Sequence, residues 1–245
     1  MRGYGRTEDK HVDNARTPTR KGAKKARPVS LTLEQAARLK AQPDTPQGRR
    51  DALLLCLLLD HGLRVGEVAG LQVTDFDLAA GELRFYRPKV DKIQTHKLTA
   101  DTLAAARAYM ARAGDRPAQG PVLRASRKGG ALQDAGMIPQ PQCGRGMTAR
   151  ALTARVHDLG AAVGLVGLSA HDLRHYWATR AARNGTQLDR LQDAGGWASP
   201  ATPALAAAAA AQAQVCRCGM WRRPRSRTRG CCLGSGGRAF HTRRG

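Results

Sequence analysis

The chain has 245 residues, an ordinary apolar fraction of 42%, few aromatic residues and a formal net charge of +22. This excess of positive charge points to a polyanionic partner, with nucleic acid the first candidate. No apolar run is longer than the eight residues of Ala52–Leu59, which is far short of the roughly 20 residues that a membrane-spanning helix needs. The charged N-terminus lacks an apolar export segment, so we expect neither a membrane protein nor an exported one.

The positive charge is concentrated at the two ends of the sequence. Residues 1–27 carry nine Lys and Arg against three acidic residues and show no hydrophobic period. After Asp193 there are nine Arg and no acidic residue. We therefore expect a flexible basic arm at 1–27, one folded domain at 28–203 and a disordered Ala/Arg-rich tail at 204–245. In the plainer interpretation, both of these terminal segments are simply solvated and bind no partner.

The six cysteines do not form a metal-binding pattern. Cys56 lies inside the apolar run and is expected to be a small buried residue, while Cys143 is isolated in a Gly/Pro/Gln-rich segment. The C-x-C and C-C spacings of the other four fit no common zinc site (Cys216, Cys218, Cys231 and Cys232). This usage indicates a reducing, cytoplasmic setting.

Two helices are predicted to open the folded part. Thr32 can cap the first helix, and Pro43 and Pro46 close it. Its inward-facing apolar residues are predicted to be Leu33, Ala36, Ala37 and Leu39. The second, at about 49–61, is apolar nearly all round, so it should form the buried centre of the domain, and Gly62 ends it.

Arg64 follows this buried helix among apolar neighbours, in the segment G-L-R-V-G-E-V-A-G-L. An arginine in such surroundings is either paired or presented to an anion. Glu67, three residues on, can hold it from the same helical face. A simple surface ion pair explains this segment equally well.

Residues 82–98 change to a period of two, which predicts a short hairpin in a small antiparallel sheet. Lys89 and Lys92 stand at its tip. A lysine there is ordinarily just solvated, and it matters only if the tip reaches into a groove. Further helices are predicted at 100–113, 148–163 and 187–194, with a long Gly/Pro-punctuated loop at 114–146.

The stretch L-S-A-H-D-L-R-H is typical of the start of a helix. Ser169 is a favourable N-cap, and Asp172 can return the capping hydrogen bond. His171 and Arg174 then share one face near the positive end of the helix dipole. An imidazole, a guanidinium and a helix N-terminus together predict a phosphate-binding site.

These motifs resemble the catalytic domain of the tyrosine recombinase (phage integrase) family. The likeness rests on the order and rough spacing of four features over about 28–203: Arg64 in its segment, the hairpin lysine, H-D-L-R-H, and G-G-W-A-S-P. It implies an α+β fold, mostly helical, with a small antiparallel sheet. It also implies double-stranded DNA as the partner, a homo-oligomer on DNA, no metal or other cofactor, and a cytoplasmic, nucleoid-associated protein. Type IB topoisomerases share the pattern more loosely.

The reaction implied by the resemblance is site-specific DNA recombination through a 3′-phosphotyrosyl intermediate. Arg64 and Arg174 would clamp the nonbridging oxygens of the scissile phosphate. His171 would hydrogen-bond the phosphate or assist proton transfer. Lys89, or Lys92 if the hairpin register differs, would protonate the leaving 5′-oxygen.

By the same resemblance Trp197 is a fifth catalytic residue, and Glu67 and His175 have supporting roles. Trp197 occupies the place of a second histidine in many relatives, and its indole N–H can donate to phosphate but cannot take a proton. Glu67 would orient Arg64. His175 is expected to be a core histidine that packs its helix.

The expected nucleophile is absent from its place. In the family a tyrosine follows about nine residues after the position of Trp197, where this chain has Ala206. The four tyrosines all lie upstream of it (Tyr4, Tyr86, Tyr109 and Tyr176). From Ala204 the composition changes to an alanine run and then to an Arg/Cys-rich stretch, which indicates a reading-frame shift near codons 202–206. A natural Arg-rich DNA-binding tail is the alternative.

Two functions are therefore open. One is an active recombinase that receives its tyrosine from another chain, and the other is a catalytically dead, DNA-binding remnant of an integrase. Relatives also carry a helical core-binding domain before the catalytic one, so we expect that it was lost or that the start lies upstream. A ribosomal or nucleoid-type basic protein would suit the charge but leaves the ordered motifs unexplained.

Overall fold

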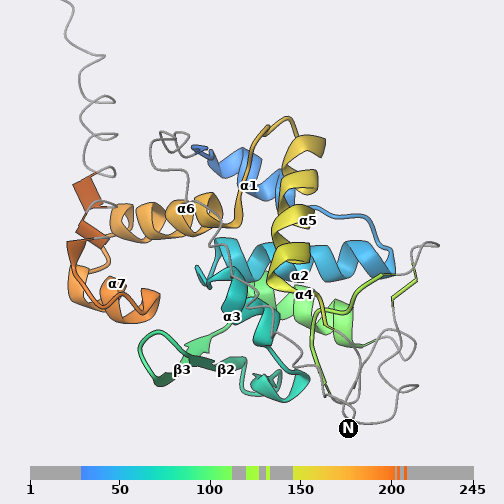
Figure 1. Ribbon diagram of the computed structural model, residues 1–245, viewed down its shortest axis with the longest axis horizontal. Coiled ribbons are helices and arrows are strands. Elements are labelled where there is room, and N and C mark those ends of the chain that lie inside the picture. Colours follow the sequence, from blue (N-terminus) through green and yellow to red (C-terminus); the bar gives the residue numbers. More distant parts are fainter. Residues whose placement is uncertain are drawn as a thin grey trace, which may run out of the picture.

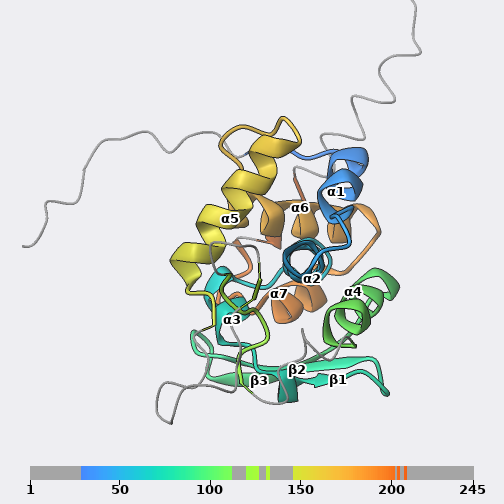
Figure 2. The same cartoon turned by 90° about the vertical axis from the view of Figure 1, so that its right-hand side faces the viewer.

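The computed structural model describes residues 29–111, 120–126, 131–132, 146–201, 203–204 and 207–208. In chain order its elements are α1 (Leu33–Lys40), α2 (Pro46–Leu59), α3 (Val65–Gly70), the 3-10 turn η1 (Val73–Asp75), β1 (Phe76–Asp77), β2 (Glu82–Arg87), β3 (Lys92–Lys97), α4 (Ala100–Met110), α5 (Ala149–Ala162), α6 (Ala170–Arg183) and α7 (Leu188–Gly195). The helices lie above a small sheet, which forms the lower edge of the domain in Figure 1 and Figure 2. The predicted fold class, mostly helical α+β with a small antiparallel sheet, is confirmed.

α2 is the buried centre of the domain. Thr45 caps its start by accepting from the amide of Gly48. Every residue from Leu53 to Leu59 is buried. The helices α1, α4 and α6 pack around it, as the view along its axis in Figure 2 shows. The prediction of a buried central helix is confirmed.

Two details near the start of the domain differ from the sequence-based expectation. Pro46 begins α2 instead of closing the preceding helix, because the first helical turn does not use the amide hydrogen that proline lacks. In α1, Ala36 and Leu39 are buried, but Leu33 is 67% exposed and Ala37 is also exposed. A helix this short covers only a narrow stripe against α2, so the apolar positions beside the stripe face solvent.

The predicted hairpin is present as β2 and β3, with Arg87 opposite Lys92 at its end. The two-residue strand β1 pairs with the other side of β2 and was not predicted, since two residues show no period. Alternation along β2 buries every second side chain (Leu83, Phe85 and Arg87). The strand therefore carries a charged group into the interior.

The later helices begin at their predicted caps. Thr148 accepts from a backbone amide in the first turn of α5. Ser169 and Asp172 form the reciprocal capping box at the start of α6. α7 ends at Gly195, and Gly196 takes the left-handed conformation with φ of 59°, which glycine adopts without strain.

Several predictions lie outside the described residues. These are the basic arm at 1–27, most of the tail at 204–245 with Ala206, and Cys143 with the four C-terminal cysteines. Cys56, which the structure describes, is buried as expected. Within the described part of the chain, the helices are too short or too polar to cross a membrane.

Two largely buried histidines meet where the chain leaves α2 and where β3 passes it. The rings of His61 and His96 stack with centroids 5.8 Å apart, and His61 Nε2 lies 3.1 Å from the hydroxyl of Thr102. Burial lowers the pKa of each to about 4, and for His96 the neighbouring His61 and Arg87 add to the effect. Both rings are therefore neutral at physiological pH.

Acid is expected to destabilise the fold through these two histidines. Their folded pKa lies below the ordinary value of 6.5, so the unfolded chain binds more protons, and stability present above pH 6.5 is lost as the pH falls toward 4. The loss is up to about 3 kcal/mol for each ring. Urea unfolding between about pH 7.5 and 4.5 measures it. His61→Gln should weaken the pH dependence of the unfolding free energy. His157→Gln, which replaces an exposed histidine of α5, should leave it unchanged. Equal pH dependence in both variants would refute the assignment to His61.

Candidate functional site

Arg64 lies where the chain leaves α2 and enters α3. Its amide donates to Glu67 Oε2 (2.8 Å) and its guanidinium to Glu67 Oε1 (2.7 Å), so one carboxylate holds both ends of the residue. The second terminal nitrogen donates to the carbonyl of Gly196 (2.6 Å). The Glu67 side chain is only 4% exposed. The alternative interpretation, in which Arg64 and Glu67 form a simple surface ion pair, is therefore wrong.

Arg174 joins three parts of the chain from its place near the start of α6. It is 5% exposed, and its two terminal nitrogens donate to the carbonyls of Gly62 and Gly195. Its guanidinium also lies over the ring of Trp197, with Cζ 4.4 Å from the ring centroid. The side chain thus links the end of α2, α6 and the end of α7.

A third arginine, which the sequence reasoning missed, lies beside these two. Arg87 ends β2 with its side chain fully buried. It donates to the carbonyls of Ala194 and Gly195 (both 2.7 Å) and to Glu67 Oε1 (3.3 Å). The signal that could have found it was the period of two, because Arg87 follows Phe85 and Leu83 on the buried face of the strand.

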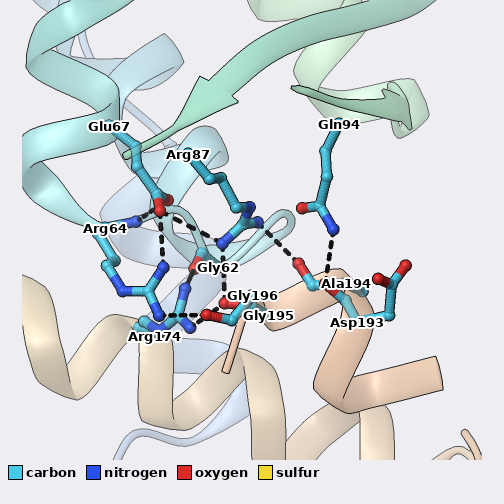
Figure 3. Close-up of polar contacts among 10 residues, drawn as sticks. All are labelled: Gly62, Arg64, Glu67, Arg87, Gln94, Arg174, Asp193, Ala194, Gly195 and Gly196. Carbon is cyan, nitrogen blue, oxygen red and sulfur yellow. Dashed lines mark hydrogen bonds and ion pairs between the residues drawn. The ribbon is translucent and has the colours of Figure 1, made fainter. Parts of the chain in front are cut away.

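Figure 3 shows the resulting arginine cluster, which consists of Arg64, Arg87, Arg174 and Glu67 against the turn after α7. Three positive side chains against one negative leave a formal excess of two positive charges. Burial first, and then Arg64, lowers the pKa of Arg174 to about 9, and burial likewise lowers the pKa of Arg87. The cluster is short of negative charge, so an anion is the ligand that it favours.

The hairpin places its two candidate lysines differently. Lys89 is exposed and has no hydrogen-bond or ion-pair partner among the described residues. It is two residues from Arg87, a span of at most about 7 Å of chain. Lys92 instead pairs with Asp193 (2.8 Å), and Gln94 donates to the Asp193 carbonyl (2.7 Å). The hairpin is tied to the end of α7, and Lys89 is left available beside it.

His171 and Arg174 both lie near the start of α6, but their environments differ. Arg174 is buried, whereas His171 is exposed and its ring meets that of His175, with centroids 4.3 Å apart and Nε2 atoms 2.9 Å apart. One of the two nitrogens donates and the other accepts. His175 is half-buried, so the expectation of a core histidine is wrong.

Trp197 is half-buried directly after the turn that ends α7. It offers its ring face to Arg174, and its centroid lies 5.9 Å from that of Trp177. Of the predicted site residues, contacts therefore unite Arg64, Glu67, Arg174 and Trp197. Lys89 is not part of that set of contacts, and His171 pairs with His175. In the described ranges no group of three or more His, Cys, Asp or Glu side chains could hold a metal ion.

Known proteins resemble this chain over most of its described length. The model of the phage integrase family matches residues 30–205. A tyrosine recombinase XerC from Pelobacter propionicus is 31% identical over 177 residues, which cover 71% of this chain and 53% of the relative. A tyrosine recombinase XerD from Neisseria meningitidis serogroup B is 31% identical over 168 residues, 68% of this chain and 53% of the relative. The chain thus spans about half the length of these curated relatives.

Solved structures show the same similarity. XerA recombinase superposes with a TM-score of 0.59 at 22% identity, over 85% of this chain and 68% of that one. XerH recombinase bound to difH in a pre-cleavage complex gives a TM-score of 0.56 at 21% identity, over 81% of this chain and 56% of that one. At these identities the similarity establishes a shared fold.

Proposed function

Because this chain belongs to the phage integrase family, we propose that it is the catalytic domain of a site-specific DNA recombinase and that its arginine cluster binds a backbone phosphate of double-stranded DNA. The observation that carries the proposal is the excess of two positive charges in a largely buried cluster held by a single carboxylate. A DNA phosphate supplies the missing negative charge. The basic ends of the chain add sequence-independent attraction to the same polyanion.

In the proposed mechanism Arg64 and Arg174 hold the nonbridging oxygens of the scissile phosphate. Charge on these oxygens must be neutralised by fixed donors during phosphoryl transfer. Two of the five N–H donors of Arg174 bind carbonyls, which leaves further donors of the planar fork for an oxyanion. Both guanidinium groups are already ordered by protein contacts, so little reorganisation is needed when a phosphate arrives.

The remaining predicted residues have proposed roles around that phosphate. Lys89 protonates the leaving 5′-oxygen, and the pairing of Lys92 with Asp193 supports Lys89 as the proton donor. His171 and Trp197 donate hydrogen bonds to the phosphate. Glu67 and His175 position their neighbours: the first orients Arg64, and the second orients His171 through the contact between their rings.

We further propose that this chain binds DNA but does not form the phosphotyrosyl link on its own. Ala206 stands where the nucleophile is expected, outside the described residues. Two of the described tyrosines are engaged elsewhere, since Tyr109 donates to a backbone carbonyl and Tyr86 donates to a carboxylate. The hydroxyl of the third, Tyr176, is buried without a hydrogen-bond partner among the described residues, so it is not exposed to DNA. The chain is then either a DNA-binding remnant or the partner of a second chain that supplies the tyrosine. In both cases we propose that it acts in the cytoplasm in association with the nucleoid, and that it assembles on DNA as a homo-oligomer.

A nicked suicide duplex tests both parts of this proposal. Such a substrate traps a covalent protein–DNA adduct, because the fragment released by cleavage diffuses away before it can be rejoined. We expect salt-sensitive binding of the duplex and no adduct in denaturing gels. An adduct mapped to any tyrosine of this chain would overturn the missing-nucleophile proposal, and failure to bind the duplex at low salt would overturn the DNA-binding proposal.

A further inference from the structure

Arg87 is a buried cation whose place in the site no motif assigned. Its side chain is fully buried, and its guanidinium lies 4.9 Å from the centroid of the Phe85 ring. Its hydrogen bonds go to Glu67 and to the last carbonyls of α7, those of Ala194 and Gly195. A positive charge is favourable there, since the C-terminal end of a helix carries partial negative charge. The Arg87 side chain is fully buried, whereas Arg64 is 22% exposed and Arg174 retains 5%, so Arg87 is the member of the cluster that is not presented to DNA.

The helix that Arg87 holds has little apolar packing of its own. α7 has eight residues, and its buried residues are Leu191 and Gly195. One leucine contributes about 1.5–3 kcal/mol when buried, which is too little to fix a short helix. The end of α7 is instead fixed by polar contacts to β2 and β3: those of Arg87 with two carbonyls, of Gln94 with the Asp193 carbonyl, and of exposed Lys92 with the Asp193 carboxylate.

The turn after α7 is where Arg64, Arg174 and Trp197 meet. Gly196 packs directly on Arg87, because a Cβ at that position would lie 2.7 Å from Arg87 Cδ. Arg87 and Arg174 both donate to the Gly195 carbonyl. The position of this turn therefore decides where Trp197 lies over Arg174, and Arg87 fixes that position from the sheet side.

We propose that Arg87 is a positioning residue of the phosphate site, which acts through Gly195, Gly196 and Trp197. The inference rests on the proposed function, because the turn that Arg87 fixes carries Trp197, which is a proposed phosphate donor. Arg87 remains bound to α7 and Glu67, while Arg64 and Arg174 bind the phosphate. Without Arg87 the turn loses its contacts with β2, and only those of Gln94 and Lys92 with Asp193 still hold the end of α7 to the sheet. Trp197 then moves from its place over Arg174, and DNA affinity falls although the phosphate-binding arginines are intact.

Fluorine NMR of the whole chain labelled with 5-fluorotryptophan tests this directly, with the Trp197 signal assigned by Trp197→Phe. Arg87→Met keeps an unbranched apolar side chain and removes both the charge and the fork, and Arg87→Lys keeps the charge without the planar fork. Arg84→Met is the matched control, because Arg84 lies on the same strand with its side chain exposed. We expect the Trp197 signal to shift by more than its linewidth in both Arg87 variants, less in Arg87→Lys, and to stay in place in Arg84→Met.

The outcomes separate this inference from the proposed function. A Trp197 signal that stays in place in folded Arg87→Met, or in Arg87→Lys if the methionine variant does not fold, would overturn the positioning role whatever happens to DNA binding. A shifted signal in a protein whose unsubstituted form fails to bind duplex DNA would support the positioning role and reject the proposed function. A purely structural role would lower the unfolding free energy and leave the Trp197 signal of the folded molecules unchanged.

Discussion

Replacing Arg174 with alanine is expected to weaken the binding of duplex DNA by about tenfold to a hundredfold, because hydrogen bonds between charged partners contribute about 1.5–3 kcal/mol. The substitution removes a guanidinium that is already ordered by Gly62, Gly195 and Trp197. It also removes one of the three positive charges of the arginine cluster. Fluorescence anisotropy of a labelled duplex at several salt concentrations measures the change.

Matched variants separate this effect from the general basicity of the chain. Arg183→Ala removes an exposed arginine from the same helix and should cost at most one phosphate contact, visible as a change of about one in the salt slope. Arg174→Lys keeps the charge without the planar fork and should recover only part of the affinity. Equal losses in Arg174→Ala and Arg183→Ala would mean that the protein binds DNA merely as a polycation.

Asp51→Ala is expected to lower the free energy of unfolding by about 3–5 kcal/mol, since removing one partner of a buried ion pair leaves uncompensated charge behind. Asp51 on α2 is completely buried. Its Oδ1 accepts from Arg50 (3.0 and 2.8 Å) and its Oδ2 from Arg155 of α5 (2.9 and 2.6 Å). Arg50 in turn donates to the carbonyl of Arg124 (3.0 Å). One carboxylate thus connects the central helix to α5.

Urea unfolding at neutral pH measures this loss of stability. Asp158→Ala removes a carboxylate from α5 that is 66% exposed and should change stability by less than about 0.5 kcal/mol. Asp51→Asn keeps the shape and one acceptor, so its effect should lie between the two. A loss in Asp51→Ala no larger than in Asp158→Ala would show that α5 is held by its apolar contacts alone.

Local chemistry accounts for most of what the sequence predicted correctly. The capping box of Ser169 and Asp172, and the hairpin at 82–98, depend on neighbours a few residues apart, so their patterns are visible in one sequence. Pro46 was misassigned because proline is compatible with both the end of one helix and the first turn of the next.

The composition of the site was predictable only in part. Arg64 and Arg174 were expected to share a site, and they do meet at one turn, but their partners are the carbonyls of Gly196, Gly62 and Gly195. Every residue carries a carbonyl, so no sequence signal tells which of them an arginine meets; only the path of the chain decides it.

The different environments of His171 and Arg174 also have a geometric reason. Residues three apart differ by about 60° around a helix, and the edge of the buried face of α6 passes between these two. Arg87 was the real omission, since the alternation of β2 already assigned it to the buried face. A buried arginine needs a partner, and the partners of Arg87 are the carbonyls at the end of α7.

The most direct measurement is a titration of the ¹⁵N-arginine-labelled chain with a short duplex, followed through guanidinium Nε–Hε resonances assigned with Arg→Lys variants. If the arginine cluster holds a DNA phosphate, the resonances of Arg64 and Arg174 shift saturably, while that of buried Arg87 stays near its place. Shifts confined to the arginines of the two basic ends, with Arg64 and Arg174 unmoved at saturating duplex, would contradict a phosphate site in this domain.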